Sequence, residues 1–352
     1  MEPPHERALR EIEEVFGDRL KRGPAPGGAG DALGSVSPMS AEEVELLAEV
    51  AGRYSVPLAA LGAGTASAPG SKGGGILIHF DLMRGLRLPE KEEPWVEAEP
   101  GASWLQLDDN LRTRGWGLAV YPTSAPRATV GGWLTQDGLG VGSFEYGWLS
   151  ENVLSASLVM PGGGRREVQG EDLRSFVGPE DGGAIAVGAK LRTRRADADV
   201  PFGATFGSAK QLVGAVVSAA EARLPLWHLA FLNPRMARAR GLAEDYTLFG
   251  AYEAGERAAE AEAGLGSVFE SQGGRALPAA GAHRAWGERF FPVAPSHPTP
   301  SSTRELVHLS DLGGALVRAE GGSSHTAVQG TVARSGEVLL LILDAQEEEW
   351  AR

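Results

Sequence analysis

The sequence predicts an α+β fold in which two differently organised parts follow one another along the chain. Up to about residue 197, apolar runs of strand length alternate with helices that begin at capping residues. From residue 198 the predicted order is strand, helix, strand, strand, helix, strand, which is the split βαβ pattern of a small α+β module. Helices and sheets are therefore expected in both parts.

Two capping boxes mark helices in the first part. Ser40 and Ser103 each precede a helical pattern and are followed three residues later by Glu or Gln. Strands are predicted at "PLAALG", "GILIHFDL", "WVEAEPG", "VLSASLVM" and "AIAVGAKLRTR". Residues 1–35 hold a short amphipathic helix and a linker rich in Gly and Pro, so we expect the first ordered domain at residues 36–197.

The second part begins with the strand "VPFGATFG" and a helix capped by Ser208. Strands at "LWHLAFL" and "YTLFGAYE", a helix at "AGERAAEAEAGLGSVFESQG" and a last strand at "GRALP" complete a domain expected at residues 198–295. The Pro-rich stretch "GAHRAWGERFFPVAPSHPTPS" is interpreted as a connector. In the C-terminal segment, residues 296–352, "GGALVRAEGG" and "EVLLLILDA" are predicted to be closing strands.

Composition excludes several classes of protein. The net charge of −13 makes the chain a poor candidate for binding nucleic acid or an anionic membrane surface. The absence of cysteine excludes disulfides, cysteine zinc sites, iron–sulfur ligation by this chain and a thiol nucleophile. The charged N-terminus does not resemble a signal peptide, and no apolar run reaches the ~20 residues of a membrane span. We therefore expect a cytoplasmic protein that acts on small molecules.

The first loop with a chemical signal is "ALGAGTAS". A predicted strand leads directly into Gly62, Ala63, Gly64 and Thr65, whose N–H groups could turn together toward one anion. The loop lacks the Lys of a P-loop and the third glycine of a Rossmann fingerprint. Taken alone, the loop is more readily interpreted as a Gly-rich turn.

The second such loop is "ATVGGWLTQDGLGVGSFEYGWLSENV", which has six glycines in 26 residues. Adjacent Gly131 and Gly132 would let the backbone lie flat against a ligand, and the retained aromatic residues would wall it in. The alternative is a Gly-rich loop that packs against its own sheet.

The order "PLAALGAGTASAPG", then "YPTSAPRATVGGWLTQDGLGVGSFEYGWLS", then "GGAIAVGAKLRTR" resembles the FAD-binding domain of the vanillyl-alcohol oxidase/p-cresol methylhydroxylase (PCMH) superfamily. The resemblance covers residues 36–195 and is greatest to the glycolate oxidase and D-lactate dehydrogenase group. It implies a PCMH-type domain in which two α+β subdomains hold FAD, followed by a small ferredoxin-like α+β cap. "WGERFFP" resembles a segment that follows the cap in this group.

The resemblance also implies which residues hold the cofactor. The first loop would bind the pyrophosphate, and the second would lie along the pyrophosphate and ribityl chain and lead to the flavin. The residues assigned in this way are Gly62, Ala63, Gly64, Thr65, Ala66, Ser67, Pro122, Thr123, Ser124, Thr129, Val130, Gly131, Gly132, Trp133, Gly138, Gly142, Ser143, Tyr146, Gly147, Gly183, Ala184 and Ile185.

Three departures from the family pattern bear on chemistry. Leu61 stands where many members have Arg before the first glycines. Neither FAD loop contains the His that carries covalent flavin in some members, and no Cys exists for the other linkage, so FAD is expected to be non-covalent. The seven His residues are scattered and the cap is short, so no metal site like that of the D-lactate and 2-hydroxyglutarate enzymes is expected.

The resemblance implies an FAD-dependent oxidoreductase that oxidises a small alcohol or 2-hydroxy acid, such as glycolate or lactate, by hydride transfer. Electrons would pass to oxygen, a quinone or an iron–sulfur or other electron-transfer subunit. One alternative is a non-catalytic FAD-binding or electron-relay subunit of a multi-subunit oxidoreductase. Another is a nucleotide- or sugar-phosphate-binding regulator that only reuses the loops.

Two residues are candidates for catalysis. Arg289 in "GERFFP" could bind a substrate carboxylate with two parallel hydrogen bonds, or it could pair with a neighbour such as Glu288. His228 alternates with apolar residues in a predicted strand, so it could act as a base beside the flavin or be a structural residue.

Overall fold

Helices and strands alternate along the chain in the computed structural model, which confirms the α+β prediction. The structure describes residues 2–24, 32–64, 75–89, 92–177, 183–196, 198–291, 302–321 and 326–344. The chain divides into two compact units. Unit 1 comprises Met1–Leu118, Ala125–Gly138 and Leu149–Arg194, and unit 2 comprises Ala119–Ser124, Leu139–Trp148 and Arg195–Arg352.

The first sheet of unit 1 has four strands in the order β1-β2-β4-β3. Its strands are β1 (Leu20–Arg22), β2 (Gly34–Val36), β3 (Leu58–Leu61) and β4 (Ile76–His79). β1 is antiparallel to β2, whereas β2 and β3 are each parallel to β4. The ends of the predicted linker are therefore the paired strands β1 and β2.

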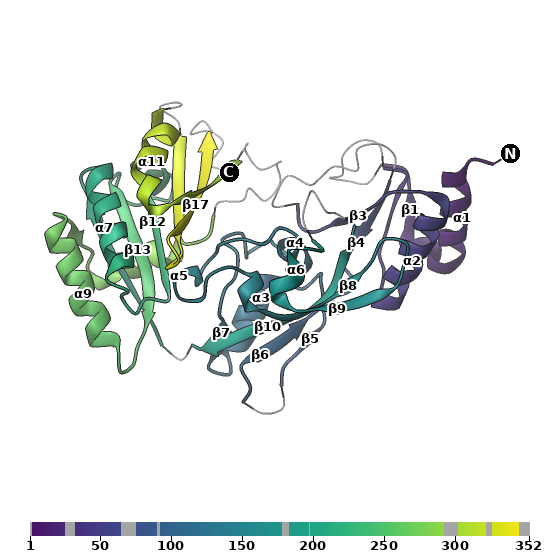
Figure 1. Ribbon diagram of the computed structural model, residues 1–352, viewed down its shortest axis with the longest axis horizontal. Helices are drawn as coiled ribbons and strands as arrows, with labels where there is room; N and C mark the ends of the chain where they lie inside the picture. Colours follow the sequence, from purple (N-terminus) through teal and green to yellow (C-terminus); the bar gives the residue numbers. More distant parts are fainter. Residues whose placement is uncertain are drawn as a thin grey trace. The chain divides into compact units, whose positions relative to one another are not determined.

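Two helices cover this sheet (Figure 1). They are α1 (Pro4–Phe16) and α2 (Ala41–Tyr54), with the short 3₁₀ helix η1 (Gly17–Arg19) between α1 and β1. The predicted cap of α2 is present, because the Ser40 side chain accepts a hydrogen bond from the Glu43 N–H. The apolar faces of both helices pack with β2 and β4 in one buried core.

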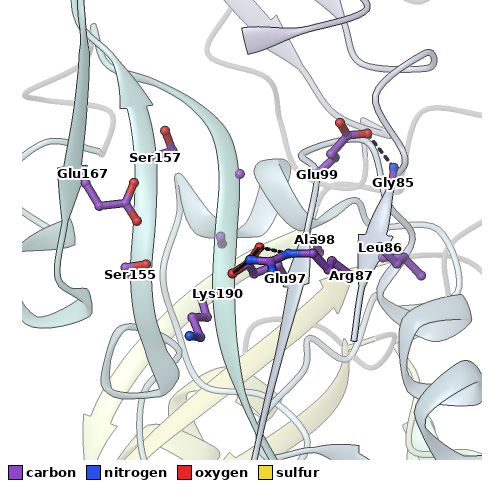
Figure 2. Close-up of a pocket in the computed structure, with 12 residues that line it drawn as sticks. Gly85, Leu86, Arg87, Glu97, Ala98, Glu99, Ser155, Ser157, Glu167 and Lys190 are labelled. Carbon is purple, nitrogen blue, oxygen red and sulfur yellow. Dashed lines mark hydrogen bonds and ion pairs between the residues drawn. The ribbon is translucent and has the colours of Figure 1, made fainter. Parts of the chain in front are cut away.

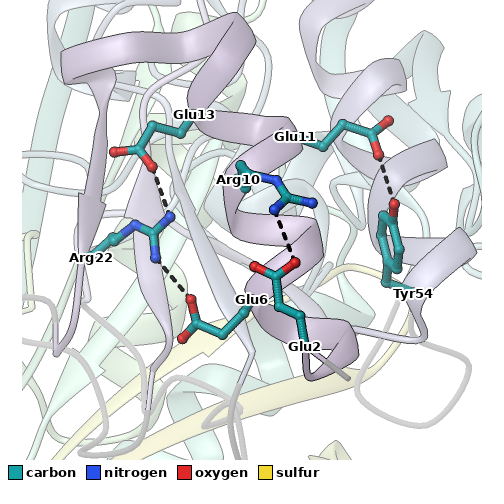
Figure 3. Close-up of polar contacts among 7 residues, drawn as sticks. All are labelled: Glu2, Glu6, Arg10, Glu11, Glu13, Arg22 and Tyr54. Atoms are coloured by element: carbon teal, nitrogen blue, oxygen red, sulfur yellow. Dashed lines mark hydrogen bonds and ion pairs between the residues drawn. The ribbon is translucent and has the colours of Figure 1, made fainter.

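The polar side of α1 is tied to its neighbours by charged contacts (Figure 3). Arg22 in β1 donates to Glu6 at 3.0 Å and to Glu13 at 2.7 Å, and the Tyr54 hydroxyl of α2 donates to Glu11 at 3.1 Å. Exposed pairs of this kind contribute little stability, so the buried core holds α1 in place.

The second sheet of unit 1 has six strands and is built around β10, which pairs antiparallel with both β6 and β8. Its strands are β5 (Leu86–Arg87), β6 (Trp95–Ala98), β7 (Trp116–Leu118), β8 (Val153–Val159), β9 (Arg165–Val168) and β10 (Ile185–Arg195). The helices of this region are α3 (Trp104–Arg112), α4 (Val130–Leu134), η2 (Ser150–Asn152) and α6 (Gly170–Leu173). The predicted cap of α3 is also present, with Ser103 accepting from the Gln106 N–H.

Unit 2 is built on a seven-stranded sheet in the order β14-β11-β13-β12-β16-β17-β15, in which every neighbouring pair is antiparallel. Its strands are β11 (Asp199–Phe206), β12 (His228–Leu232), β13 (Tyr246–Glu253), β14 (Arg275–Ala276), β15 (Ser302–His308), β16 (Thr326–Val332) and β17 (Glu337–Asp344). β14, β11, β13 and β12 have the strand order of the predicted split βαβ module. The C-terminal segment extends the same sheet by three strands.

Helices cover both faces of this sheet. Figure 1 shows α7 (Ala209–Glu221), α9 (Ala258–Ser271) and α11 (Leu312–Gly321) on one side of it. The other face carries α8 (Pro234–Ala239) and α10 (Ala279–Gly287). Alternate residues of β12 serve the two cores: Leu229 and Phe231 face α7 and α9, whereas Ala230 and Leu232 face α8 and α10. The remaining elements are α5 (Ser143–Tyr146) and η3 (Leu309–Asp311).

Two local predictions in this part are wrong. "GGALVRAEGG" is helix α11, because its buried residues Leu312, Ala315 and Leu316 recur at helical spacing. The first half of the predicted connector is helix α10, which buries Ala282 and Ala285. No helix in the described parts of the chain is both long and apolar enough to cross a membrane.

Candidate functional site

The two glycine loops of the sequence meet in unit 1. β3 ends at Leu61 and leads into Gly62, Ala63 and Gly64, and α4 begins at its cap residue Thr129. A Cβ added at Gly62 would lie 3.0 Å from Thr129 Oγ1 and 3.3 Å from the Cα of Gly132. The loops are thus direct neighbours, as one shared diphosphate site requires. The predicted residues Thr65, Ala66 and Ser67 lie outside the described residues.

The two loops differ in the hydrogen-bond donors that they offer. The N–H groups of Val130, Gly131 and Gly132 already donate to protein acceptors at 2.8 to 3.3 Å. Within the described parts of the chain, the N–H groups of residues 62–64 donate to no acceptor. Gly64 has a φ of +67°, a left-handed conformation of the kind that turns successive N–H groups to one side. Among the described residues, the first loop therefore has backbone N–H groups without an acceptor, whereas those of Val130, Gly131 and Gly132 are used within the protein.

Several glycines of the second loop are required by the protein's own packing. A Cβ at Gly131 would lie 2.8 Å from the Pro100 Cβ. A Cβ at Gly142, whose φ is +95°, would overlap the carbonyl oxygen of Ala119. Packing alone therefore requires glycine at both positions.

The aromatic residues of this loop anchor it within its units. Trp133 is 7% exposed and packs edge-on against Trp104 with ring centroids 5.3 Å apart. Phe144 is fully buried in the unit 2 core, and the Trp148 indole N–H donates to Glu337. Tyr146, at the end of α5, is half-buried.

Residues 139–148 belong to unit 2, but the residues just before and after them belong to unit 1; we call this segment the 139–148 excursion. The residues on either side of it are linked by hydrogen bonds of the Asp137 side chain. The Asp137 carboxylate accepts from the Ser150 N–H at 2.9 Å and the Ser150 hydroxyl at 2.8 Å, and it pairs with Arg174. The carbonyl of Gly138, which has a φ of +148°, accepts from the Leu149 N–H at 3.1 Å. Both ends of the excursion are thereby held together.

The other predicted FAD residues occupy three places. Pro122, Thr123 and Ser124 belong to the segment of unit 2 at 119–124, where the Thr123 carbonyl accepts from the Phe291 N–H at 2.9 Å. Ser143 is the first residue of α5, and Gly147 is the residue that follows it, in the same unit. Gly183 and Ala184 precede β10 in unit 1, and Ile185 is its buried first residue.

His228 is the first residue of β12 and is fully buried. Its Nδ1 accepts the N–H of Gly142 at 3.3 Å. Burial, with a smaller contribution from the Arg289 charge, lowers the pKa of His228 to about 3, so the ring is neutral at pH 7. A neutral ring whose Nδ1 accepts carries its proton on Nε2. That Nε2 has no hydrogen-bond partner in the described part of the chain.

His228 is therefore a donor at Nε2, because its lone pair on Nδ1 is already used by Gly142. This geometry does not suit a general base, which needs an available lone pair within reach of the substrate proton. The hydrogen bond instead fixes the Gly142 backbone to β12, and Trp227 reinforces it by donating its indole N–H to the Ala119 carbonyl at 3.0 Å.

Arg289 is half-buried and surrounded by aromatic rings. Its Nε donates to the Tyr121 hydroxyl at 3.1 Å and its Nη1 donates to the Trp286 carbonyl at 3.1 Å. The guanidinium carbon lies 4.5 Å from the Trp286 ring centroid and 4.2 Å from that of Phe290. Within the described residues it has no carboxylate partner, since Glu288 lies beside Arg240 instead.

The sequence analysis did not identify two residues that bind the backbone around Arg289. Arg240 and Gln329 are buried polar side chains that bind the backbone of residues 288–290. Burial lowers the pKa of Arg240 to about 10, which leaves it charged at neutral pH. Three arginines lie between residues 235 and 240, and only burial in the folded chain distinguishes Arg240 from the other two.

A hollow of about 420 Å³ lies on the polar face of the second sheet of unit 1 (Figure 2). Glu97 holds Arg87 across the strands, and Glu99 accepts the Gly85 N–H. None of the predicted site residues lines it. Nor do the described residues contain any group of three or more His, Cys, Asp or Glu able to hold a metal ion.

Comparison with known proteins identifies the nucleotide-binding part. Residues 32–169 match the FAD binding domain family. The chain is 30% identical over 171 residues to the mitochondrial D-lactate dehydrogenase [cytochrome] of Arabidopsis thaliana, covering 45% of this chain and 29% of that protein. It is 28% identical over 254 residues to the D-lactate dehydrogenase of Archaeoglobus fulgidus, covering 67% of this chain and 54% of that protein. The chain thus spans 29% to 54% of the length of these relatives.

The fold resembles that of p-cresol methylhydroxylase. The structure of p-cresol methylhydroxylase with substrate bound superposes with a TM-score of 0.78, covering 99% of this chain and 85% of that chain at 13% identity. At this identity the likeness concerns the fold alone. It confirms the predicted PCMH-type fold class, and the family match confirms the predicted FAD-binding domain.

Proposed function

We propose that this chain, whose residues 32–169 belong to the FAD binding domain family, is an FAD-dependent oxidoreductase that oxidises a small alcohol or 2-hydroxy acid. The observation that carries the substrate class is Arg289, a half-buried cation among aromatic rings without a carboxylate partner in the described residues. A guanidinium in such a place suits the carboxylate of a 2-hydroxy acid.

The first loop fits the diphosphate of FAD. The N–H groups of residues 62–64 donate to no acceptor among the described residues, and the glycine contact between Gly62 and Gly132 keeps side chains out of the space beside them. Such a site needs no lysine, which is consistent with the acidic chain. FAD, when bound, supplies the acceptor for a hydride. With neither Cys nor a loop His available, we expect it to be held non-covalently.

The residues of unit 2 would orient the substrate. Arg289 would bind its carboxylate, with the Tyr121 hydroxyl 3.1 Å from Arg289 Nε fixing the guanidinium. Packing against Trp286 and Phe290 keeps water from this cation and so strengthens its hold on an anion. His228 would hold the Gly142 backbone, and we assign it no proton transfer.

The second candidate is an FAD-binding or electron-relay subunit. It is favoured by the chemistry of the two residues first considered catalytic, because a guanidinium such as that of Arg289 has no acceptor lone pair and the His228 lone pair is occupied. Neither can accept the proton of a substrate hydroxyl. In this case an iron–sulfur or other electron-transfer subunit would exchange electrons with this chain.

The test is anaerobic mixing of the FAD-loaded protein with a panel of 2-hydroxy acids and the corresponding alcohols. Bleaching of the flavin band by a 2-hydroxy acid, with the KM raised at least tenfold in Arg289→Met but not in the exposed control Arg284→Met, supports the first proposal. Reduction only by an added redox partner supports the second. Protein that takes up no FAD would refute both. Release of FAD by acid precipitation tests non-covalent binding.

A further inference from the structure

The buried Arg240 side chain makes an unusual set of hydrogen bonds, to two backbone carbonyls and to one side-chain amide. It directly follows α8, and its side chain is 5% exposed. Its Nη1 donates to the carbonyl oxygens of both Glu288 and Phe290, and its Nη2 donates to Gln329 Oε1 at 2.7 Å. A carboxylate oxygen of Glu288 lies 3.9 Å away. Backbone carbonyls therefore accept its hydrogen bonds, and the Glu288 charge adds a longer-range contact.

Gln329 completes the arrangement from the sheet. It lies in β16, is fully buried, and donates through Nε2 to the carbonyl of Arg289 at 3.0 Å. Three successive carbonyls, of residues 288, 289 and 290, are thus bound by two buried side chains that also bind each other. We call this pair the Arg240–Gln329 clamp.

Arg240 could serve only to cap the C-terminal end of α10, but that role would need fewer hydrogen bonds than the Arg240–Gln329 clamp makes. α10 ends at Gly287, so a cation near residue 288 also satisfies the negative end of the helix. Binding all three following carbonyls does more, because it fixes the peptide planes on both sides of the Arg289 Cα. The direction in which the Arg289 side chain leaves the backbone is set by those planes.

We propose that the Arg240–Gln329 clamp is the positioning device for the Arg289 guanidinium, and that Arg240 tunes affinity for a carboxylate substrate without touching it. This inference rests on the proposed function, in which Arg289 binds that carboxylate. The aromatic contacts of Arg289 and its bond to Tyr121 then hold a side chain whose starting direction is already fixed.

The experiment compares Arg240→Met, Arg240→Lys and Gln329→Leu with the control Arg238→Met in the FAD-loaded full chain. Arg238 lies in the same helix, and its side chain is 52% exposed. We expect the KM for an active 2-hydroxy acid to rise roughly 10- to 100-fold in Arg240→Met, with a much smaller change in kcat. The KM for an uncharged alcohol should not change, and Arg240→Lys should restore part of the loss.

A double-mutant cycle separates positioning from general damage. Arg240→Met in an Arg289→Met background should add nothing, because the group that it positions is gone. Additive losses, or an Arg240→Met that matches Arg238→Met, would overturn the proposal. Gln329→Leu should reproduce the effect if Arg240→Met fails to fold.

Binding of oxalate, measured by tryptophan fluorescence, tests the clamp separately from the proposed oxidation of a 2-hydroxy acid. If no 2-hydroxy acid bleaches the flavin, the proposed function fails, but the clamp is supported if Arg240→Met and Arg289→Met weaken oxalate binding to the same extent. Oxalate binding that is absent from the native protein, or equal in Arg240→Met and Arg238→Met, overturns the clamp.

Discussion

Gly142→Ala tests the packing of the second glycine loop. Gly142 has a φ of +95°, and an added Cβ would overlap the Ala119 carbonyl and lie 2.6 Å from the Trp227 indole nitrogen. The backbone conformation alone costs about 1–2 kcal/mol for alanine. Displacing the Ala119 carbonyl would also break its 3.0 Å hydrogen bond from Trp227, which costs about 1–3 kcal/mol because the donor is buried. The expected total loss of folding free energy is about 2–5 kcal/mol.

The matched control is Gly164→Ala. Gly164 has a φ of +80°, but an added Cβ would meet no atom within 4 Å. It therefore carries the backbone cost without the overlap. Urea unfolding at equilibrium, followed by tryptophan fluorescence, should show Gly142→Ala to be less stable than Gly164→Ala by about 1–3 kcal/mol. Equal losses in the two variants would refute the overlap argument.

Three further predictions concern charged groups. The folded pKa of His228 is about 3, below its ordinary 6.5, so its contribution to stability is complete above pH 6.5 and is lost as the pH falls toward 3. From pH 6.5 to pH 5 this loss should be about 2 kcal/mol, and His228→Gln should remove it from the pH profile of urea unfolding. Arg19→Met should raise the pKa of Glu43, which the paired hydrogen bonds of Arg19 lower, and should cost about 1 kcal/mol in thermal or urea unfolding. Asp137→Asn should cost about 1–3 kcal/mol and speed amide exchange at Ser150, because it weakens the closure of the 139–148 excursion.

Each has a result that would contradict it. A His228→Gln profile parallel to that of the native protein between pH 6.5 and 5 would show that His228 is not held neutral. Arg165→Met removes two ion pairs made by a more exposed arginine, so an equal effect there would show that the Arg19 pair has no special role. Asparagine tolerates the positive φ of residue 137 as well as aspartate does, so an unchanged Ser150 amide would mean that the carboxylate does not hold the excursion.

Local signals predicted much of the fold. The caps at Ser40, Ser103 and Ser208 are present because each side-chain hydroxyl satisfies an N–H only three residues away. The split βαβ order was readable because every strand of that module is apolar and bounded by turns. Helix α11 was predicted as a strand, because the paired glycines of "GGALVRAEGG" are unfavourable in a helix. Its buried residues nevertheless follow the i, i+3, i+4 spacing of a helix.

The candidate site was less predictable, because its properties arise from contacts between distant segments. The glycine loops were found, but the sequence could not show that Gly142 packs against the Ala119 carbonyl. The role of His228 depends on a hydrogen bond to a residue 86 positions earlier in the chain. Arg240 and Gln329 are 89 positions apart, and no local pattern connects them.

The path of the chain has a practical consequence for protein engineering. Unit 2 draws two short stretches, Ala119–Ser124 and Leu139–Trp148, from the middle of the part that supplies unit 1. A fragment that begins at residue 198 would keep Trp227 and His228 but discard their partners Ala119 and Gly142. We expect such a truncation to be poorly soluble, and a permutant or a co-expressed pair of fragments to need both stretches before the remaining strands can fold around them.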